Sequence, residues 1–174
     1  MKRKIAAGSV AAVAVSVLVA LSLAVASAAA MKADFSGKWT MDKAKSEGVP
    51  PGMEQTMTIT QTGDKIDLET KITGGPAGER TVKDSYTADG KETDFTPQGP
   101  QGAMGKGKRT AKWTADGTGL EVNETATIEG PNGPEEVSAT RKWTLAADGK
   151  TMTIELTLRG AEISQQSKRV FVKQ

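Results

Sequence analysis

The stretch that decides the fold runs from residue 120 to residue 129: Leu120-Glu121-Val122-Asn123-Glu124-Thr125-Ala126-Thr127-Ile128-Glu129. Its even-numbered positions are apolar apart from Glu124, whereas its odd-numbered positions are all polar. Because successive side chains of a β-strand point to opposite faces of the sheet, this alternation predicts a strand with one apolar face and one wet face.

The same two-residue period recurs along most of the chain after Ala30, and no twelve-residue stretch there keeps the apolar spacing of an amphipathic helix. Threonine fills many of the polar positions, which suits exposed strand residues because β-branched side chains favour an extended backbone. The pattern predicts ten strands, near residues 35–41, 54–61, 65–72, 79–88, 91–96, 107–115, 119–129, 135–145, 150–159 and 166–173.

Two kinds of connection separate these predicted strands. The short ones contain Gly63-Asp64, Asp89-Gly90, Asp116-Gly117 and Asp148-Gly149. The three Asp-Gly pairs are typical of two-residue hairpin turns with positive φ. The longer ones are rich in Gly and Pro and cover residues 42–52, 74–78, 97–107, 130–134 and 160–165. Because the two kinds alternate, successive hairpins place the tight turns at one end of the sheet and the long loops at the other.

The number of predicted hairpins favours a closed sheet. A ten-stranded meander that stayed open would expose two strand edges and one apolar face. Closure removes both, so we expect an all-β fold, an antiparallel up-and-down β-barrel of about 8–10 strands. A sandwich of two antiparallel sheets is the alternative, because it allows the same alternation.

The first thirty residues differ in composition from the rest. The basic start Lys2-Arg3-Lys4, an apolar run over residues 5–25 and the small-residue site Ala26-Ser27-Ala28 follow the three-part order of a secretory signal peptide. We therefore predict a signal peptide at residues 1–28, a barrel domain at residues 31–174, and export to the periplasm or the cell exterior. An uncleaved anchor is the alternative, because about 20 apolar residues can just span a bilayer.

The composition excludes several classes of chemistry. The chain has no His and no Cys, which rules out Ser-His-Asp and Cys-His catalysis, imidazole or thiolate metal sites, haem ligation and disulfides. From Met31 onward 20 basic residues stand against 21 acidic ones, and a net charge of −1 gives no reason to expect nucleic-acid binding. We expect no catalytic residue, no metal and no cofactor. A carboxylate pair such as Asp84 with Glu124 is the remaining route to hydrolysis.

Three segments resemble the calycins, the β-barrel superfamily of the lipocalins and the intracellular fatty-acid-binding proteins. Residues 34–41 are similar to the G-x-W first strand, residues 57–66 to the second hairpin of the fatty-acid-binding branch, and residues 168–173 to its last strand. The resemblance implies a cavity inside the barrel with the long loops at its mouth. It also implies that Arg169 faces inward, where the family's Arg-x-Tyr motif holds a ligand carboxylate, although Phe171 replaces the tyrosine.

The chain departs from both branches of that superfamily. Residues 43–52 are too short and too proline-bearing for the two lid helices of the fatty-acid-binding branch, and no segment near the end predicts the C-terminal helix of lipocalins. A signal peptide is also foreign to the intracellular branch. The chain is more similar to small exported bacterial proteins that are described only as lipocalin-like.

An aromatic residue precedes three of the predicted tight turns, at Tyr86, Trp113 and Trp143. We expect these rings to gather in one layer near the tight-turn end of the barrel. Core packing is the main interpretation of this layer, and a platform for stacking sugars is the alternative.

Four charged residues occupy the otherwise apolar phase: Asp84, Arg109, Glu124 and Arg141. Burying an unpaired charge is costly, so each of them needs a partner. Mutual pairing, for example of Arg141 with Glu124, is the main interpretation. The alternative is that Arg141 and Arg169 receive an acidic headgroup in the cavity.

The last strand gives two conflicting predictions. Periodicity turns Val170 and Val172 inward, whereas the resemblance turns Arg169 and Phe171 inward. If Arg169 faces inward, we expect it to cover Trp39 in a cation–π contact, as in lipocalins, in preference to binding a headgroup.

The sequence therefore predicts an exported, non-catalytic, monomeric protein that holds a small apolar or amphipathic ligand inside its barrel. The predicted ligand-binding residues are Trp39, Met57, Leu68, Tyr86, Trp113, Arg141, Trp143 and Arg169. The alternative is an envelope or secreted interaction protein, structural in role, whose barrel is filled by its own side chains. Its contact would be the glycine-rich loop at residues 97–107.

Overall fold

The structure is a computed structural model that describes residues 32–75, 78–99, 102–103, 105–130, 133–161 and 164–174. The strands of its main sheet are β1 (Gly37–Met41), β2 (Glu54–Thr62), β3 (Lys65–Thr73), β4 (Arg80–Thr87), β5 (Asp89–Phe95), β8 (Gly105–Trp113), β9 (Gly119–Gly130), β10 (Gly133–Leu145), β11 (Thr151–Arg159) and β12 (Ser164–Lys173). A separate small sheet pairs β6 (Gln98–Gly99) with β7 (Gly102–Ala103), and a single 3-10 turn, η1, covers Lys43–Lys45. The ten strands of the main sheet lie close to their predicted ranges.

The predicted signal peptide at residues 1–28 lies outside the described residues and stays a prediction. Within the described part of the chain, the model contains no helix with the length and apolar character needed to traverse a lipid bilayer.

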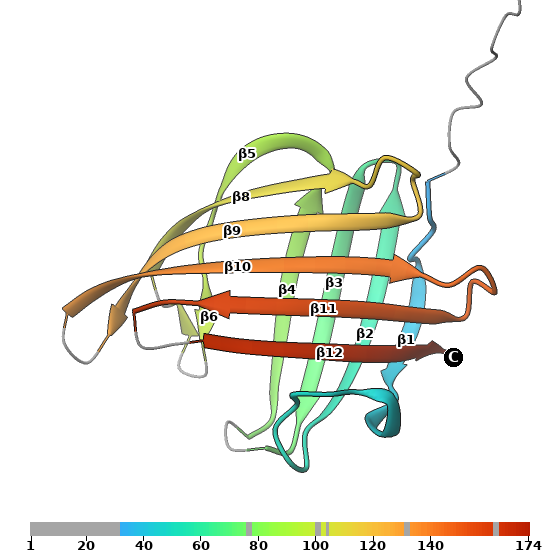
Figure 1. Cartoon of the computed structure of the whole chain (residues 1–174), viewed down its shortest axis with the longest axis horizontal. Coiled ribbons are helices and arrows are strands. Elements are labelled where there is room, and N and C mark those ends of the chain that lie inside the picture. The colour runs from blue at the N-terminus through green and yellow to red at the C-terminus, as the bar shows by residue number, and fades with distance from the viewer. Residues whose placement is uncertain (1–31, 76–77, 100–101, 104, 131–132, 162–163) are drawn as a thin grey trace, which may run out of the picture.

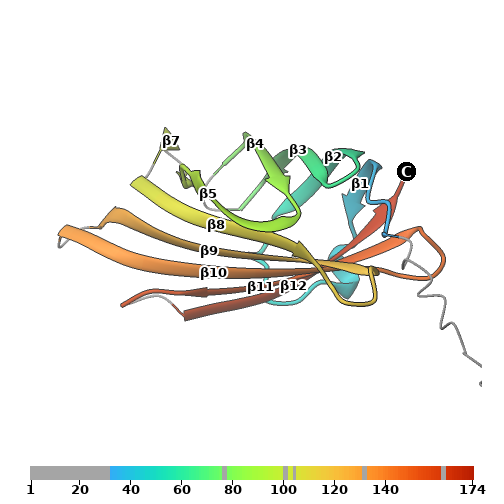
Figure 2. The same ribbon diagram turned by 90° about the horizontal axis from the view of Figure 1, so that it is seen from above.

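The main sheet curls until the first and last strands of the chain pair. Its strand order is β4-β3-β2-β1-β12-β11-β10-β9-β8-β5, and the neighbours are antiparallel. In the β1–β12 ladder Met41 lies opposite Phe171 and Trp39 opposite Lys173. Figure 1 and Figure 2 show the result as two layers, with β1–β4 crossing over β8–β12. The fold is a nearly closed up-and-down barrel, as the strand count predicted.

The barrel has one open seam, between β4 and β5, which are the two edges of the sheet. The prediction that Asp89-Gly90 forms a two-residue hairpin turn is therefore wrong. Gly90 has a positive φ of 76°, but it lies inside β5, and the chain passes from one sheet edge to the other without pairing. The amide of Ala88 donates to the carbonyl of Asp64 at 2.8 Å, so the residue that follows β4 is held against the β2–β3 turn.

The other tight turns exist, but two are longer than predicted. Gly63-Asp64 is a two-residue turn, with Thr62 opposite Lys65. The β8–β9 and β10–β11 turns span more residues, because Gly117 and Gly149 close type I turns by donating their amides to Thr114 and Ala146, each at 2.9 Å. Asp116-Gly117 and Asp148-Gly149 thus mark the positions of these two turns but not their lengths.

The predicted aromatic layer forms at the tight-turn end. Trp143 packs edge-on against Tyr86, with centroids 5.9 Å apart, and against Phe35, at 5.7 Å. Phe35 also stacks on Trp113 at 6.1 Å. The segment before β1 holds Phe35 in place, since the amide of Ala33 bonds to the carbonyl of Gly117 at 2.8 Å. The layer is part of the hydrophobic core and closes this end of the barrel.

In the last strand, Arg169 and Phe171 face inward and Val172 is 36% exposed. The inward orientation implied by the resemblance is thus confirmed, and the one taken from periodicity is wrong. Val170 is apolar for a different reason: it is buried on the outer side, where the turn containing η1 packs against β12. The amide of Val170 accordingly donates to the Ser46 hydroxyl at 3.0 Å.

Candidate ligand-binding cavity

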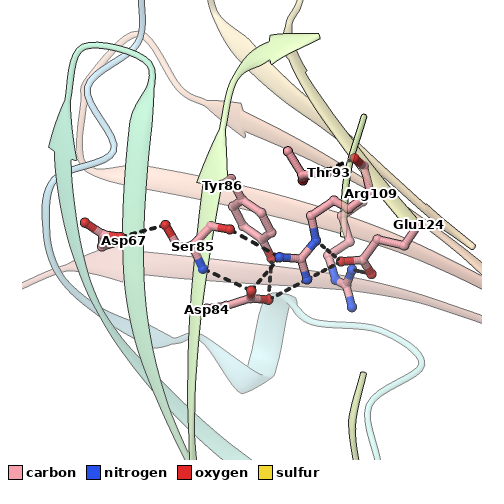
Figure 3. A network of polar contacts seen from close by, with 8 residues as sticks. Asp67, Asp84, Ser85, Tyr86, Thr93, Arg109 and Glu124 are labelled. Carbon is pink, nitrogen blue, oxygen red and sulfur yellow. Dashed lines mark hydrogen bonds and ion pairs between the residues drawn. The ribbon is translucent and has the colours of Figure 1, made fainter. Parts of the chain in front are cut away.

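A network of charged side chains crosses the middle of the barrel and centres on Arg109. The Arg109 guanidinium donates to both carboxylate oxygens of Asp84, at 2.6 and 3.0 Å, and to Glu124 at 2.6 Å (Figure 3). Arg141 donates to the other oxygen of Glu124. The Arg109 and Glu124 side chains are only 9% and 5% exposed, so these ion pairs are largely shielded from solvent.

Strand register explains three members of this network. Arg109 on β8 lies directly opposite Glu124 on β9, and Arg141 on β10 is the diagonal neighbour of Glu124, because Ala139 takes the opposite position. The predicted pairing of Arg141 with Glu124 is therefore confirmed. Asp84 comes from β4, across the seam, so its ion pair with Arg109 joins two strands that have no backbone ladder between them.

Two aromatic rings enclose the Arg109 guanidinium. Its central carbon lies 4.7 Å from the centroid of Tyr86 and 4.3 Å from that of Phe95. The Tyr86 hydroxyl donates to Asp84 at 3.2 Å, and burial raises the pKa of that phenol. Burial alone would lower the pKa of Arg109, but its hydrogen bond to Asp84 and the nearby acidic groups raise it overall. Arg109 is therefore a fixed, fully charged bridge.

Two adjoining cavities of the described structure border this network. The larger one has a volume of about 360 Å³, and apolar side chains such as Val82, Ile128 and Leu158 line much of it. The smaller one, about 190 Å³, lies deeper, beside Trp143 and Phe171. Val82, Asp84 and Arg141 line both cavities.

An outer groove of about 690 Å³ runs along the seam. Asp84, Phe95 and Arg109 line this groove and the larger cavity alike. The wall between the exterior and the interior is therefore made of side chains here, and its main bond is the ion pair of Asp84 with Arg109.

Arg169 points into the smaller cavity, but it does not cover Trp39. The side chain over the Trp39 ring is Lys173, whose amine lies 5.3 Å from the centroid, because Lys173 is the residue opposite Trp39 in the β1–β12 ladder. The prediction for Arg169 as the cover of Trp39 is therefore wrong. Arg169 instead donates to the side-chain carbonyl of Gln55 at 3.1 Å. Burial, then the positive charges of Arg141 and Arg80, lower the pKa of Arg169.

The structure brings six of the eight predicted ligand-binding residues together around the smaller cavity: Met57, Leu68, Tyr86, Arg141, Trp143 and Arg169. The other two lie towards the tight-turn end. Trp39 is fully buried and donates its indole N–H to the carbonyl of Phe35 at 2.8 Å. Trp113 donates to Asp64 at 2.8 Å. Neither ring lines the cavity, because the packed aromatic layer surrounds them.

Sequence reasoning missed four polar residues on the inward side: Gln55, Thr70, Arg80 and Ser167. Gln55 and Thr70 line the smaller cavity, and Ser167 is buried beside Leu156. The signal was available, since Gln55 shares its phase with Met57, and Thr70 with Leu68.

The described residues offer no arrangement suited to metal binding, since no three acidic side chains among them converge. The carboxylates of Asp84 and Glu124, left open by the sequence as a pair for hydrolysis, both bind Arg109. Their geometry is that of an ion-pair network, and it supplies no free base.

Comparisons with known proteins found a likeness among solved structures alone. No protein-family model matches the sequence, and no curated protein matches it either. Among solved structures, the chain is similar to zebrafish ileal bile acid-binding protein complexed with cholic acid, with 18% sequence identity and a TM-score of 0.48. The match covers 80% of this chain and 98% of that one.

Proposed function

We propose that this protein is a non-catalytic binding protein that holds a small amphipathic ligand inside its barrel. The observation that carries the proposal is the larger internal cavity of about 360 Å³, which adjoins the smaller one of about 190 Å³. Ligand sites in proteins typically have volumes of about 300–1,000 Å³, with apolar walls and a few convergent polar groups. Both features are present here.

The ligand enters from the long-loop end. Pro97, which lies just before β6, lines the larger cavity, as do Ile128 and Leu158 near the outer ends of β9 and β11. The tight-turn end is filled by the aromatic layer of Phe35, Trp113 and Trp143. An apolar tail therefore lies in the larger cavity, and a polar head lies deeper.

Arg141 and Arg169 are the groups that would bind that head. Both line the smaller cavity, and Arg169 contacts no carboxylate among the described residues. An acidic head group would supply the charge that a buried guanidinium requires. In this proposal the ligand stays intact, so material that copurifies with the protein is not turned over.

The proposed setting is outside the cytoplasm. The three-part leader at residues 1–28 supports export to the periplasm or the exterior, and the absence of Cys and His suits a domain that depends on its core and strand ladders alone. We propose that the exported chain acts as a monomer.

Ligand capture is tested by mass spectrometry of lipids that copurify from the native host, and by tryptophan fluorescence during titration with 1-decanol and decanoate. We expect a bound amphiphile and a fluorescence shift, because Trp143 lines the cavity. An absent lipid together with an unchanged spectrum for both probes would contradict the proposal and favour a filled interaction protein.

A matched pair of variants locates the site. Ala139 lines the larger cavity, whereas Ala115 lies exposed in the β8–β9 turn. Ala139→Leu should weaken binding by about tenfold or more, because added methylenes occupy the space of the tail. Ala115→Leu, the control, should leave the dissociation constant unchanged.

A further inference from the structure

Four buried hydrogen-bond donors lack an acceptor among the described residues: Arg80 Nη1, Trp143 Nε1, Ser167 Oγ and Arg169 Nε. Buried donors in native proteins are nearly always paired, because an unpaired one loses its hydrogen bond to water and gains nothing. Their concentration in one part of the barrel therefore indicates a site where a ligand supplies the missing acceptor atoms.

Two of these donors line the smaller cavity, and the other two lie on neighbouring inward positions of β4 and β12. Trp143 on β10 and Arg169 on β12 line it directly. Ser167 lies two positions from Arg169 on the same side of β12. Arg80 on β4 lies opposite Ile72, which also lines the cavity. Burial, then the positive charges of Arg141 and Arg80, lower the pKa of Arg169, which agrees with this placement.

The charges around this cavity do not balance. Asp84 and Glu124, the acidic members of the central network, are already bound by Arg109 and Arg141. Among the described residues no carboxylate pairs with Arg80 or Arg169, although both side chains face inward and are only partly exposed. Two positive charges thus remain uncompensated. Keeping them in a shielded interior is costly unless an anion joins them.

Building on the proposed function, we propose that the ligand is an amphiphile with a dianionic head group, a phosphomonoester, which the donors of Arg80, Trp143, Ser167 and Arg169 bind in the smaller cavity. A phosphomonoester carries close to two negative charges at neutral pH and three acceptor oxygens. A carboxylate carries one charge and two oxygens, and so leaves one guanidinium unpaired. Guanidinium groups also match the geometry of phosphate oxygens.

The side-by-side arrangement of the two cavities fits such a molecule. Val82, Asp84 and Arg141 line both, so a head bound beside Arg169 lies next to the larger cavity, where the alkyl chain would bind. That cavity has the apolar walls of Ile128 and Leu158.

Decyl phosphate and decyl sulfate test the charge of the head, because their chains are equal and both heads are tetrahedral. The sulfate ester keeps one negative charge, whereas the phosphate ester gains its second above a pKa of about 6. We measure both affinities by isothermal titration calorimetry at about pH 5 and about pH 8, on either side of that pKa. We expect similar affinities at the lower pH, and decyl phosphate to bind at least about tenfold more tightly at the higher pH, as one further charge-assisted bond implies.

Substitutions identify which residues cause the preference for decyl phosphate over decyl sulfate. Arg80→Gln and Arg169→Gln should each abolish the preference for decyl phosphate at the higher pH, and Arg169→Lys, which keeps the charge and the fold, should retain much of it. Arg159→Gln makes the same chemical change at an exposed position of β11 and should leave the preference intact.

Each outcome decides one question. Equal affinities for the two esters at both pH values would overturn the dianionic head but leave the carrier proposal standing, since both esters would bind. Failure of both esters and of 1-decanol to bind would overturn the carrier itself. Inorganic phosphate separates a lipid head from a free ion, and if it binds as tightly as decyl phosphate, the ligand is not an amphiphile and the proposal fails.

Discussion

At the scale of single residues, Glu124 is the member of the network that depends most on its partners. Its carboxylate accepts hydrogen bonds from Arg109 on one neighbouring strand and from Arg141 on the other. Two-residue alternation placed Glu124 on the inward side, and the cost of a buried charge predicted its pairing with Arg141. The pairing of Arg109 with Asp84 across the seam could not be predicted in this way, because no local sequence pattern relates residue 84 to residue 109.

Replacing Glu124 should therefore destabilise the fold strongly. Glu124→Gln keeps the shape but removes the charge shared by the buried Arg109 and the half-buried Arg141, so we expect the free energy of unfolding to fall by about 3–5 kcal/mol. Urea denaturation at neutral pH measures the change. Glu121→Gln on the outward side of β9 is the control, and its loss should stay below about 1 kcal/mol, as for other surface pairs. Equal, small losses for both variants would show that the network contributes little to stability.

At the scale of elements, the hairpins depend on aspartates that organise the turns. In the β8–β9 turn, Asp116 accepts hydrogen bonds from the Thr114 hydroxyl, the Thr118 amide and the Thr118 hydroxyl, at 2.6, 3.1 and 2.7 Å. Asp148 accepts the Lys150 amide in the β10–β11 turn at 2.7 Å. The aspartate therefore holds the turn through its side chain, while the glycine supplies the positive φ that ends it.

This arrangement predicts a pH dependence. The hydrogen bonds from Thr114 and Thr118 lower the pKa of Asp116 from 3.8 to about 2. A carboxyl group with a lowered pKa stabilises the fold above its ordinary pKa, and this contribution disappears as pH falls through the lowered value. We expect the melting temperature of the unaltered protein to exceed that of Asp116→Asn at neutral pH, and the difference to vanish between about pH 4 and pH 2.

Differential scanning calorimetry across that pH range measures the difference between the two proteins. Glu129→Gln, which removes an exposed carboxylate from the far end of β9, controls for the general loss of a negative charge. A difference between Asp116→Asn and the unaltered protein that persists unchanged at about pH 2 would show that the ionised carboxylate is not what holds the turn.

At the scale of the whole molecule, the barrel closes in two different ways. A backbone ladder joins β1 to β12, whereas no ladder joins β4 to the β5–β8 pair. The Arg109 side chain spans the seam by bonding to the Asp84 carboxylate and the Ser85 carbonyl, with Phe95 against the same guanidinium. The larger cavity shares Asp84, Phe95 and Arg109 with the seam groove, so the seam lies beside the proposed site.

Hydrogen exchange should reveal this asymmetry. Alternate amides of β4 bond to β3 and the others face the seam, so we expect the latter to exchange much faster than the amides of Phe171 and Val172 in β12, which have a paired strand on each side. Residue-resolved exchange by nuclear magnetic resonance measures both sets. Arg109→Met should further speed exchange in β4 and leave β12 unchanged. Uniform protection of β4, equal to that of β12, would mean that the seam is closed by contacts other than side chains.

The sequence by itself determined where the strands lie and which side of most strands faces inward. It could do so because a strand's side chains alternate with a period of two, a local property that burial imposes on each segment separately. The same property placed Asp84, Arg109, Glu124 and Arg141 inside, and the turn preference of Asp-Gly located the β8–β9 and β10–β11 turns. Alternation gave the wrong orientation for Val170. A neighbouring turn buries the outer side of that strand, so an outward-facing position there is apolar like an inward-facing one.

The tertiary structure alone decided which segments meet. It placed the seam between β4 and β5, gave Arg109 a partner on β4, put Lys173 over Trp39 in place of Arg169, and gathered unpaired donors from three strands around one cavity. The reason is that each of these contacts joins residues far apart in the chain. Their distance depends on how the whole sheet curls and in which register its strands pair, and no local pattern of side chains specifies either.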